Sequence, residues 1–233
     1  MKPKFLLLLL LIPLLHGMFS TKEIPKNHAT NMMNVSTEDM VYNSFSQKEE
    51  VPGEPIDLGL SVLWANHNMG ATYPEGYGDY YAWGELEVKD VYDWSTYKHS
   101  EGTRKTCRKL GKIISGTEYD VAHVKWGGKW RLPTQEEIRE LCTRCDYVWT
   151  KINGVQGVKF IARNGNTIFF PNSGYRKEKD LYDRGLYGCY WSGTAETRNK
   201  AGNAYILALI ERYKGWNPKP RPDGCSIRPV MDK

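Results

Sequence analysis

Cysteine is the residue with the most potential chemistry in this chain of 233 residues, and it occurs at five positions. Cys142 and Cys145 form a C-x-x-C pair, a spacing that is typical of redox and zinc sites. Structural zinc sites use four ligands, however, and neither a second C-x-x-C pair nor an H-x-x-x-H pattern accompanies it. We therefore expect no metal site here. The others are Cys107, Cys189 and Cys225, and an odd total leaves at least one thiol unpaired.

Other side-chain patterns do not predict catalysis. The sequence shows no Ser/His/Asp arrangement, and the carboxylates of Glu85, Glu87 and Asp90 occur together in a mixed loop. General acid and base catalysis requires a defined pair of groups, which this loop does not supply. We therefore expect no catalytic residue and no cofactor.

The N-terminal residues are expected to direct the chain out of the cytoplasm. Lys2 and Lys4 precede an apolar run that is too short to span a bilayer, the layout of a secretory signal peptide over residues 1–20. The alternative is an uncut membrane anchor, because the residues before Thr21 match a small-x-small cleavage site poorly. After signal cleavage we expect no integral membrane domain.

Composition divides the rest of the chain at residue 56. Residues 21–55 are polar and contain three prolines, which predicts a flexible linker, whereas all eight tryptophans lie after it. Residues 56–233 are long enough for one domain with a sizeable core. The formal charge of +5 falls to +3 once Lys2 and Lys4 are removed, because residues 1–20 contain no acids. This charge is too small to indicate a nucleic-acid partner.

Two helices are predicted from their capping residues. Asp120 is a good N-cap for a short helix that ends at Gly127-Gly128. In the sequence TQEE, Thr134 and Glu137 form a capping box. Apolar residues then recur at helical spacing, which predicts an amphipathic helix of about three turns.

Short strands separated by turns follow these helices. We expect strands at residues 56–65, 157–163, 166–170, 190–192, 204–210 and 226–230. Asn164-Gly165 predicts a hairpin with a type I′ turn. Residues 212–221 are expected to form a loop, because Pro218, Pro220 and Pro222 limit strand pairing. Together these elements predict an α+β domain with long irregular loops.

Several ordered blocks of residues 56–230 resemble a known family. They are DLGLSVLWAN (57–66), NMGA (68–71), YGDYYAWGE (77–85), WGGKWRLPT (126–134), YWS (190–192), NAY (203–205) and SIRPV (226–230). These blocks resemble the Fibrobacter succinogenes major paralogous domain, a family of secreted and surface proteins of Bacteroidetes. The resemblance implies a C-type-lectin-like fold related to formylglycine-generating enzymes, in which the following residues are architectural: Arg131, Pro133, Thr134, Glu137 and Arg228.

The resemblance also bears on Cys189 and Cys225. Formylglycine-generating enzymes use copper and two of their own cysteines near the C-terminal strand, and here Cys225 lacks a neighbouring thiol in that motif. Relatives usually carry aromatic residues at positions 189 and 225. The double change to cysteine implies that the two residues face each other on neighbouring strands and form a disulfide. A copper oxidase that acts on cysteine remains an alternative function.

A ligand platform over the C-terminal strands is the other implication of the resemblance. In some relatives this region is varied by diversity-generating retroelements. Here the expected ligand residues are aromatic, amide or basic and occur in a turn-rich context; they are Arg212, Tyr213, Trp216, Asn217, Lys219 and Arg221. Trp191 and Tyr205 are expected in the core. The expected function is binding or adhesion at the cell surface or after secretion, with a glycan or protein ligand; a purely structural surface domain is the further alternative.

Overall fold

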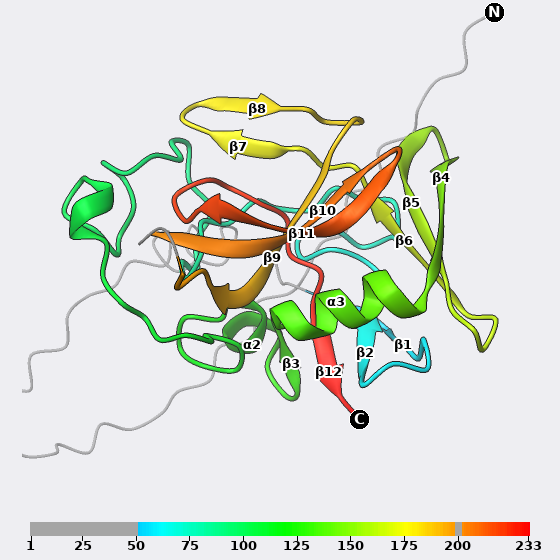
Figure 1. The fold of residues 1–233 in the computed structure, drawn as a ribbon. Helices are drawn as coiled ribbons and strands as arrows, with labels where there is room; N and C mark the ends of the chain where they lie inside the picture. The colour runs from blue at the N-terminus through cyan, green and yellow to red at the C-terminus, as the bar shows by residue number, and fades with distance from the viewer. Residues whose placement is uncertain (1–50, 199–201) are drawn as a thin grey trace, which may run out of the picture. The chain divides into compact units, whose positions relative to one another are not determined.

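Short strands make up most of the fold in the computed structural model, which describes residues 51–198 and 202–233 (Figure 1). The expected signal peptide and nearly all of the expected linker lie outside the described residues. All of the described residues belong to one compact unit. Its helices are the 3-10 turn η1 (Arg104–Thr106), α2 (Val121–Trp126) and α3 (Gln135–Arg144). The mixture of two α-helices with many strands is compatible with the expected α+β class.

The strands form four small sheets. The first, in the order β1-β2-β12-β3, contains β1 (Pro55–Ile56), β2 (Val62–Ala65), β12 (Val230–Asp232) and β3 (Trp130–Arg131). The second, in the order β11-β10-β9, contains β11 (Tyr213–Pro220), β10 (Asn203–Ile210) and β9 (Gly188–Ala195). The third, in the order β4-β5-β6, contains β4 (Asp146–Ile152), β5 (Val155–Ile161) and β6 (Thr167–Pro171). The last is the pair β7 (Tyr175–Lys177) and β8 (Asp180–Tyr182).

The folded part begins slightly earlier than residue 56. Pro55 pairs with Ala65 in the β1–β2 ladder, and Gly53 is buried. The amide of Glu54 donates to Asn66 Oδ1 at 3.0 Å, and the amide of Asn66 donates back to the carbonyl of Glu54. The last residues of the expected linker therefore belong to the first sheet.

Both predicted helices are confirmed, together with their caps. The carboxylate of Asp120 accepts hydrogen bonds from the amides of Ala122 and His123 at the start of α2. At the start of α3 the hydroxyl of Thr134 accepts from the amide of Glu137, whose carboxylate accepts from the amide of Thr134. Local hydrogen bonding of this kind satisfies amides that have no partner within the helix.

The residues expected to be architectural form two groups of contacts. Arg131 binds the Glu137 carboxylate through both terminal nitrogens, at 2.9 and 2.6 Å, and also contacts Asp232 on β12. Pro133 accepts a hydrogen bond from the amide of Gly193 on β9. These bonds tie the start of α3 to two sheets.

Arg228 is fully buried and forms hydrogen bonds to the end of β2 and the loop after it. Its Nε donates to Asn68 Oδ1 at 2.8 Å, and its Nη1 donates to the carbonyls of Ala65 and Asn66. Its Nη2 has no partner among the described residues. Burial without a carboxylate partner lowers the pKa of Arg228 to about 10.

The β9–β11 sheet separates two parts of the core. Trp191 of β9 and Ile206 of β10 pack into one cluster, whereas Tyr190 and Leu207 pack into the other. Successive side chains of a strand point to opposite faces, so each strand supplies both clusters. Helix α3 covers the second face, where Ile138 joins the cluster, and Figure 1 shows the helix running along this sheet.

Four local predictions were wrong. The expected strand at residues 56–65 is instead two short strands, β1 and β2, which pair with each other. Residues 213–220 form a strand that pairs with β10 over its full length, not a loop. Because β11 lies at the edge of its sheet, the nitrogen atoms of Pro218 and Pro220, which carry no hydrogen, can face away from β10. Gly165 has a positive φ but Asn164 does not, so that turn is not type I′; the type I′ geometry occurs at Asn153-Gly154 between β4 and β5. The last strand is also displaced, from 226–230 to Val230–Asp232.

Candidate ligand cleft

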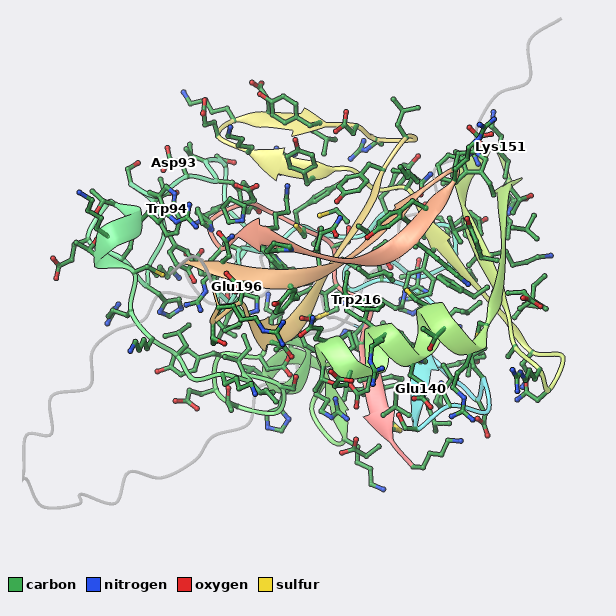
Figure 2. All side chains as sticks on the ribbon, in the orientation of Figure 1. Asp93, Trp94, Glu140, Lys151, Glu196 and Trp216 are labelled. Atoms are coloured by element: carbon green, nitrogen blue, oxygen red, sulfur yellow. The ribbon has the colours of Figure 1, made fainter. Side chains whose placement is uncertain are left out.

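The six residues expected to bind a ligand do not lie on one surface. Trp216 is opposite Leu207 in the β10–β11 ladder, and Asn217 is opposite Ile206. Since directly opposite residues share a face, Trp216 lies on the α3 side of the sheet, while Tyr213 and Asn217 lie on the other side. Figure 2 shows Trp216 next to α3.

On the face away from α3, the side chains are occupied by contacts within the protein. The hydroxyl of Tyr213 donates to Asn217 Oδ1 at 3.1 Å. Lys219 Nζ lies 3.1 Å from the Asp223 carboxylate and 3.3 Å from the centroid of the Tyr175 ring. The charge of Lys219 is therefore already balanced by the fold.

Arg221 and Arg212 have opposite environments. Arg221 is only 6% exposed, lies over the Trp83 ring at 4.3 Å and donates to the carbonyls of Asn203 and Arg108. It therefore joins three segments of the fold and is not accessible as a surface ligand group. Arg212 is exposed in the turn between β10 and β11.

A cleft of about 630 Å³ lies on the α3 side of the β9–β11 sheet. We call this the α3 cleft. Its lining combines two aromatic side chains with hydroxyl, amide and charged groups: Lys112, Ile113, Thr134, Gln135, Glu136, Arg139, Thr194, Ala195, Thr197, Arg198, Tyr205 and Trp216.

Backbone and side-chain hydrogen bonds fix the walls of the α3 cleft. The amide of Gln135 donates to Thr194 Oγ1 at 3.0 Å, which joins the first turn of α3 to β9. The segment at Lys112 runs alongside β9, because the amide of Ala195 donates to the carbonyl of Lys112 at 2.8 Å and Ile113 is bridged to Thr194. The cleft is thus built on paired elements, which favours a preformed site.

The aromatic floor consists of Tyr205 and Trp216 on neighbouring strands. Tyr205 is opposite Pro218, two residues from Trp216, so the two residues are diagonal neighbours on one face, with Cβ atoms about 7 Å apart. Both side chains are half-buried. Part of Trp216 packs against the cluster beneath α3, and the same side chain lines the cleft.

The charged groups of the α3 cleft come mainly from its rim. Arg139 and Glu136, one turn apart on α3, form an ion pair of 2.7 Å and are both exposed. Lys112 and Arg198 are also exposed and lie on the other wall. The lining therefore contains three basic residues and one acidic residue.

A second hollow of about 450 Å³ has a different charge balance. Its lining includes Lys89, Arg176 and Arg184 together with Asp79 and Asp90. Lys89 is already bonded to the buried Glu85 at 2.9 Å, so the remaining basic and acidic residues are equal in number. This hollow offers less to a charged ligand than the α3 cleft.

Cys189 and Cys225 face each other, as the resemblance implied. Their sulfur atoms are 2.9 Å apart and both side chains are fully buried. The structure contains both residues as free thiols, so the disulfide stays a prediction. Burial, together with the contact to Cys189, raises the pKa of Cys225 well above its usual range.

This thiol pair does not fit a copper site. Sulfur ligands of a transition metal such as zinc lie about 2.3 Å from the ion, so sulfurs 2.9 Å apart would subtend an angle of only about 80° there. That angle is narrower than trigonal or tetrahedral coordination. Complete burial of Cys189 and Cys225 also leaves no approach for the thiol of a substrate. We therefore derive no reaction through copper.

The C-x-x-C pair is also buried and is not activated. Burial raises the pKa of Cys142 to about 12 and raises that of Cys145 as well. A thiol must ionise to act as a nucleophile or a metal ligand. Within residues 51–198 and 202–233 there is no group of three or more His, Cys, Asp or Glu side chains that could hold a metal ion.

Comparisons with known proteins give no relative. No family model, no curated protein and no solved structure matches this chain. No helix among the described residues is long and apolar enough to cross a membrane.

Sequence reasoning found Trp216 but missed most of the α3 cleft. Tyr205 was expected in the core, whereas it is half-buried and lines the cleft. Gln135, Arg139 and Lys112 are far from Trp216 in sequence, and only the packing of α3 and β9 brings them together. The alternation of Tyr205, Leu207 and Leu209 is the one signal that could have placed Tyr205 on the α3 face.

Proposed function

We propose that this chain is a secreted or cell-surface binding protein without catalytic activity, which holds its ligand in the α3 cleft. The observation that carries the proposal is the aromatic pair Tyr205 and Trp216 at the floor of a preformed cleft with polar walls. Tyrosine and tryptophan combine a large apolar surface with a polar tip, and they are the residues most enriched at binding surfaces. The resemblance to a family of secreted and surface domains supports the same function and location.

The chemistry of the described residues supports binding over catalysis. The two close cysteine pairs, Cys189–Cys225 and Cys142–Cys145, are buried, and Cys142 and Cys225 have raised pKa values. The α3 cleft has Glu136 as its one carboxylate, and that group is engaged by Arg139. A pair of carboxylates for acid and base catalysis is therefore absent from its lining.

Titration of saccharides and peptides against the full secreted chain tests the proposal. Trp216→Ala should weaken binding at least tenfold, whereas Tyr213→Ala should leave it within about twofold, since an interface residue at the centre of a site contributes about 2 kcal/mol or more. Tyr213 is a matched control because it is an aromatic residue of the same strand on the opposite face. Thermal unfolding shows whether each variant is folded.

Gln135→Ala provides a second test that does not disturb the core. Gln135 lines the α3 cleft from the first turn of the helix, and its side chain makes no hydrogen bond in the described structure, so its loss should weaken binding with little effect on stability. Binding that survives Trp216→Ala and Gln135→Ala but is lost in Tyr213→Ala would place the site on the other face and overturn the proposal. A purely structural domain would bind no member of the panel.

A further inference from the structure

The lining of the α3 cleft carries more positive than negative charge. Arg139 is neutralised by Glu136, with which it shares a 2.7 Å ion pair. Lys112 and Arg198 lie on the opposite wall, and the lining contains no second carboxylate to pair with them. Two exposed positive charges thus lie beside the cleft, and both would attract an anionic group bound there.

Hydrogen bonds position the backbone of both residues. The carbonyl of Lys112 accepts from the amide of Ala195, and the amide of Ile114 donates to the carbonyl of Gly193, so this segment is pinned to β9 on both sides of Ile113. At the other position, the amide of Arg198 donates to the Glu196 carboxylate at 2.5 Å. The Lys112 segment is therefore held against β9, whereas Arg198 is positioned by a local bond to a side chain just after the end of β9.

The remaining lining favours a saccharide over an apolar small molecule. Ile113 and Ala195 are the aliphatic residues of the lining, so an apolar small molecule would leave most of its polar groups without partners. Hydroxyl and amide side chains such as Thr134, Gln135 and Thr197 can pair with sugar hydroxyls. The C–H faces of a sugar ring can pack on Tyr205 and Trp216.

A peptide that adds a strand to the sheet is disfavoured by the edge itself. β11 is the outer strand next to the cleft and carries Pro218 and Pro220. Each proline lacks the N–H group that an added strand would require, a feature that protects sheet edges from pairing.

We infer that the ligand of the α3 cleft is an acidic saccharide, whose carboxylate or sulfate groups are bound by Lys112 and Arg198 while its sugar rings pack on Tyr205 and Trp216. This inference rests on the proposed function, because it names the ligand class of the same cleft. Arginine and lysine both bind such anions, arginine with a bidentate geometry.

The test compares ligands that differ only in charge. The full chain is titrated with oligogalacturonate, with its methyl ester, in which the carboxyl groups are neutral, and with a sulfated glycan. We expect roughly tenfold tighter binding of an acidic chain than of the ester, which corresponds to one hydrogen-bonded charge pair. Raising the NaCl concentration from about 50 mM to about 300 mM should weaken this binding severalfold, because salt screens the interaction.

Variants separate the charge from the aromatic floor. The double variant Lys112→Gln/Arg198→Gln should abolish the preference for acidic chains and the salt dependence. Lys151→Gln/Arg163→Gln removes the same two charges elsewhere and should change neither. Arg163 follows β5, and Figure 2 shows Lys151 at the β4–β5 hairpin, away from Trp216. These residues are exposed, so folding should be unaffected.

The outcomes distinguish the inference from the proposed function. Equal, salt-insensitive binding of the neutral and acidic chains that is lost in Trp216→Ala would overturn the acidic-saccharide inference and leave the binding function intact. Binding of a peptide or an oligonucleotide in the α3 cleft in place of any saccharide would also overturn the inference. No binding of any panel member would overturn both.

Discussion

Oxidation of Cys189 and Cys225 to a disulfide should stabilise the protein strongly. Tyr190 and Ser226 are bridged in parallel, so the cysteines that precede them lie side by side on segments about 4.8 Å apart. This spacing is within the Cα separation of about 4.4–6.8 Å that disulfides require. The bond would link residues 36 apart in the chain. A loop of this length restricts the unfolded chain by about 4 kcal/mol, or about 8 to 16 °C in Tm for a domain of this size.

The assay compares thermal unfolding with and without reductant. Protein from an oxidising compartment should show a Tm that falls by this amount when the disulfide is reduced. The Tm of Cys225→Ala should not respond to reductant, whereas that of Cys107→Ser should respond as the unaltered protein does. Because burial raises the pKa of Cys225, we expect the bond to form during folding and not in the folded protein. Peptide mapping that finds Cys189 and Cys225 alkylated, together with an unchanged Tm, would refute the reasoning.

Three further predictions concern the fold. Asp120→Ala should lower the free energy of unfolding by about 3 to 5 kcal/mol, because it removes a helix cap and leaves the amides of Gly116 and Leu132 without their acceptor. Urea unfolding measures this loss, with the exposed residue change Glu118→Ala as the control. Burial lowers the pKa of His99, so the unfolded chain binds a proton at higher pH than the folded protein does. The free energy of unfolding should therefore fall as pH drops below about 6.5. Urea midpoints measured across this pH range should show the fall, and it should be absent in His99→Gln. Gly154→Ala should cost about 1 kcal/mol, because φ is 82° at this position; an unchanged urea midpoint would argue against the type I′ turn.

The helices were predictable because their signals are local. Asp120 and Thr134 cap amides only two or three residues away, so the sequence contains both partners of each bond. The capping box at Thr134 and Glu137 therefore predicts the start of α3 without knowledge of the tertiary structure.

Strand β11 was missed because its environment is not local. Pro218 and Pro220 exclude the interior of a sheet, but they are tolerated at an edge, and only the topology shows that β11 is one. The two Asn-Gly pairs show a similar limit. Both connect hairpin strands, yet only Asn153-Gly154 has the two positive φ angles of a type I′ turn, because the strands there pair up to Ile152 and Val155.

The α3 cleft was predictable only in part. Trp216 was predicted as a ligand residue because it is aromatic and lies in a turn-rich segment. The sequence alone does not show that Tyr213 and Asn217 lie on the opposite face of the sheet. Their separation depends on the strand register, because neighbouring positions of a strand alternate between faces. The polar wall from Gln135 depends on the docking of α3 against β9 through Thr194.

The indole Nε1–H signal of Trp216 in an NMR titration tests the central claim most directly. The chain has eight tryptophans, and Trp64, Trp83 and Trp191 are fully buried in the core. If the α3 cleft holds the ligand, then saturation with a bound acidic saccharide should shift the Trp216 signal and leave those of the three buried residues in place. A Trp216 signal that does not move when the protein is saturated would contradict the account.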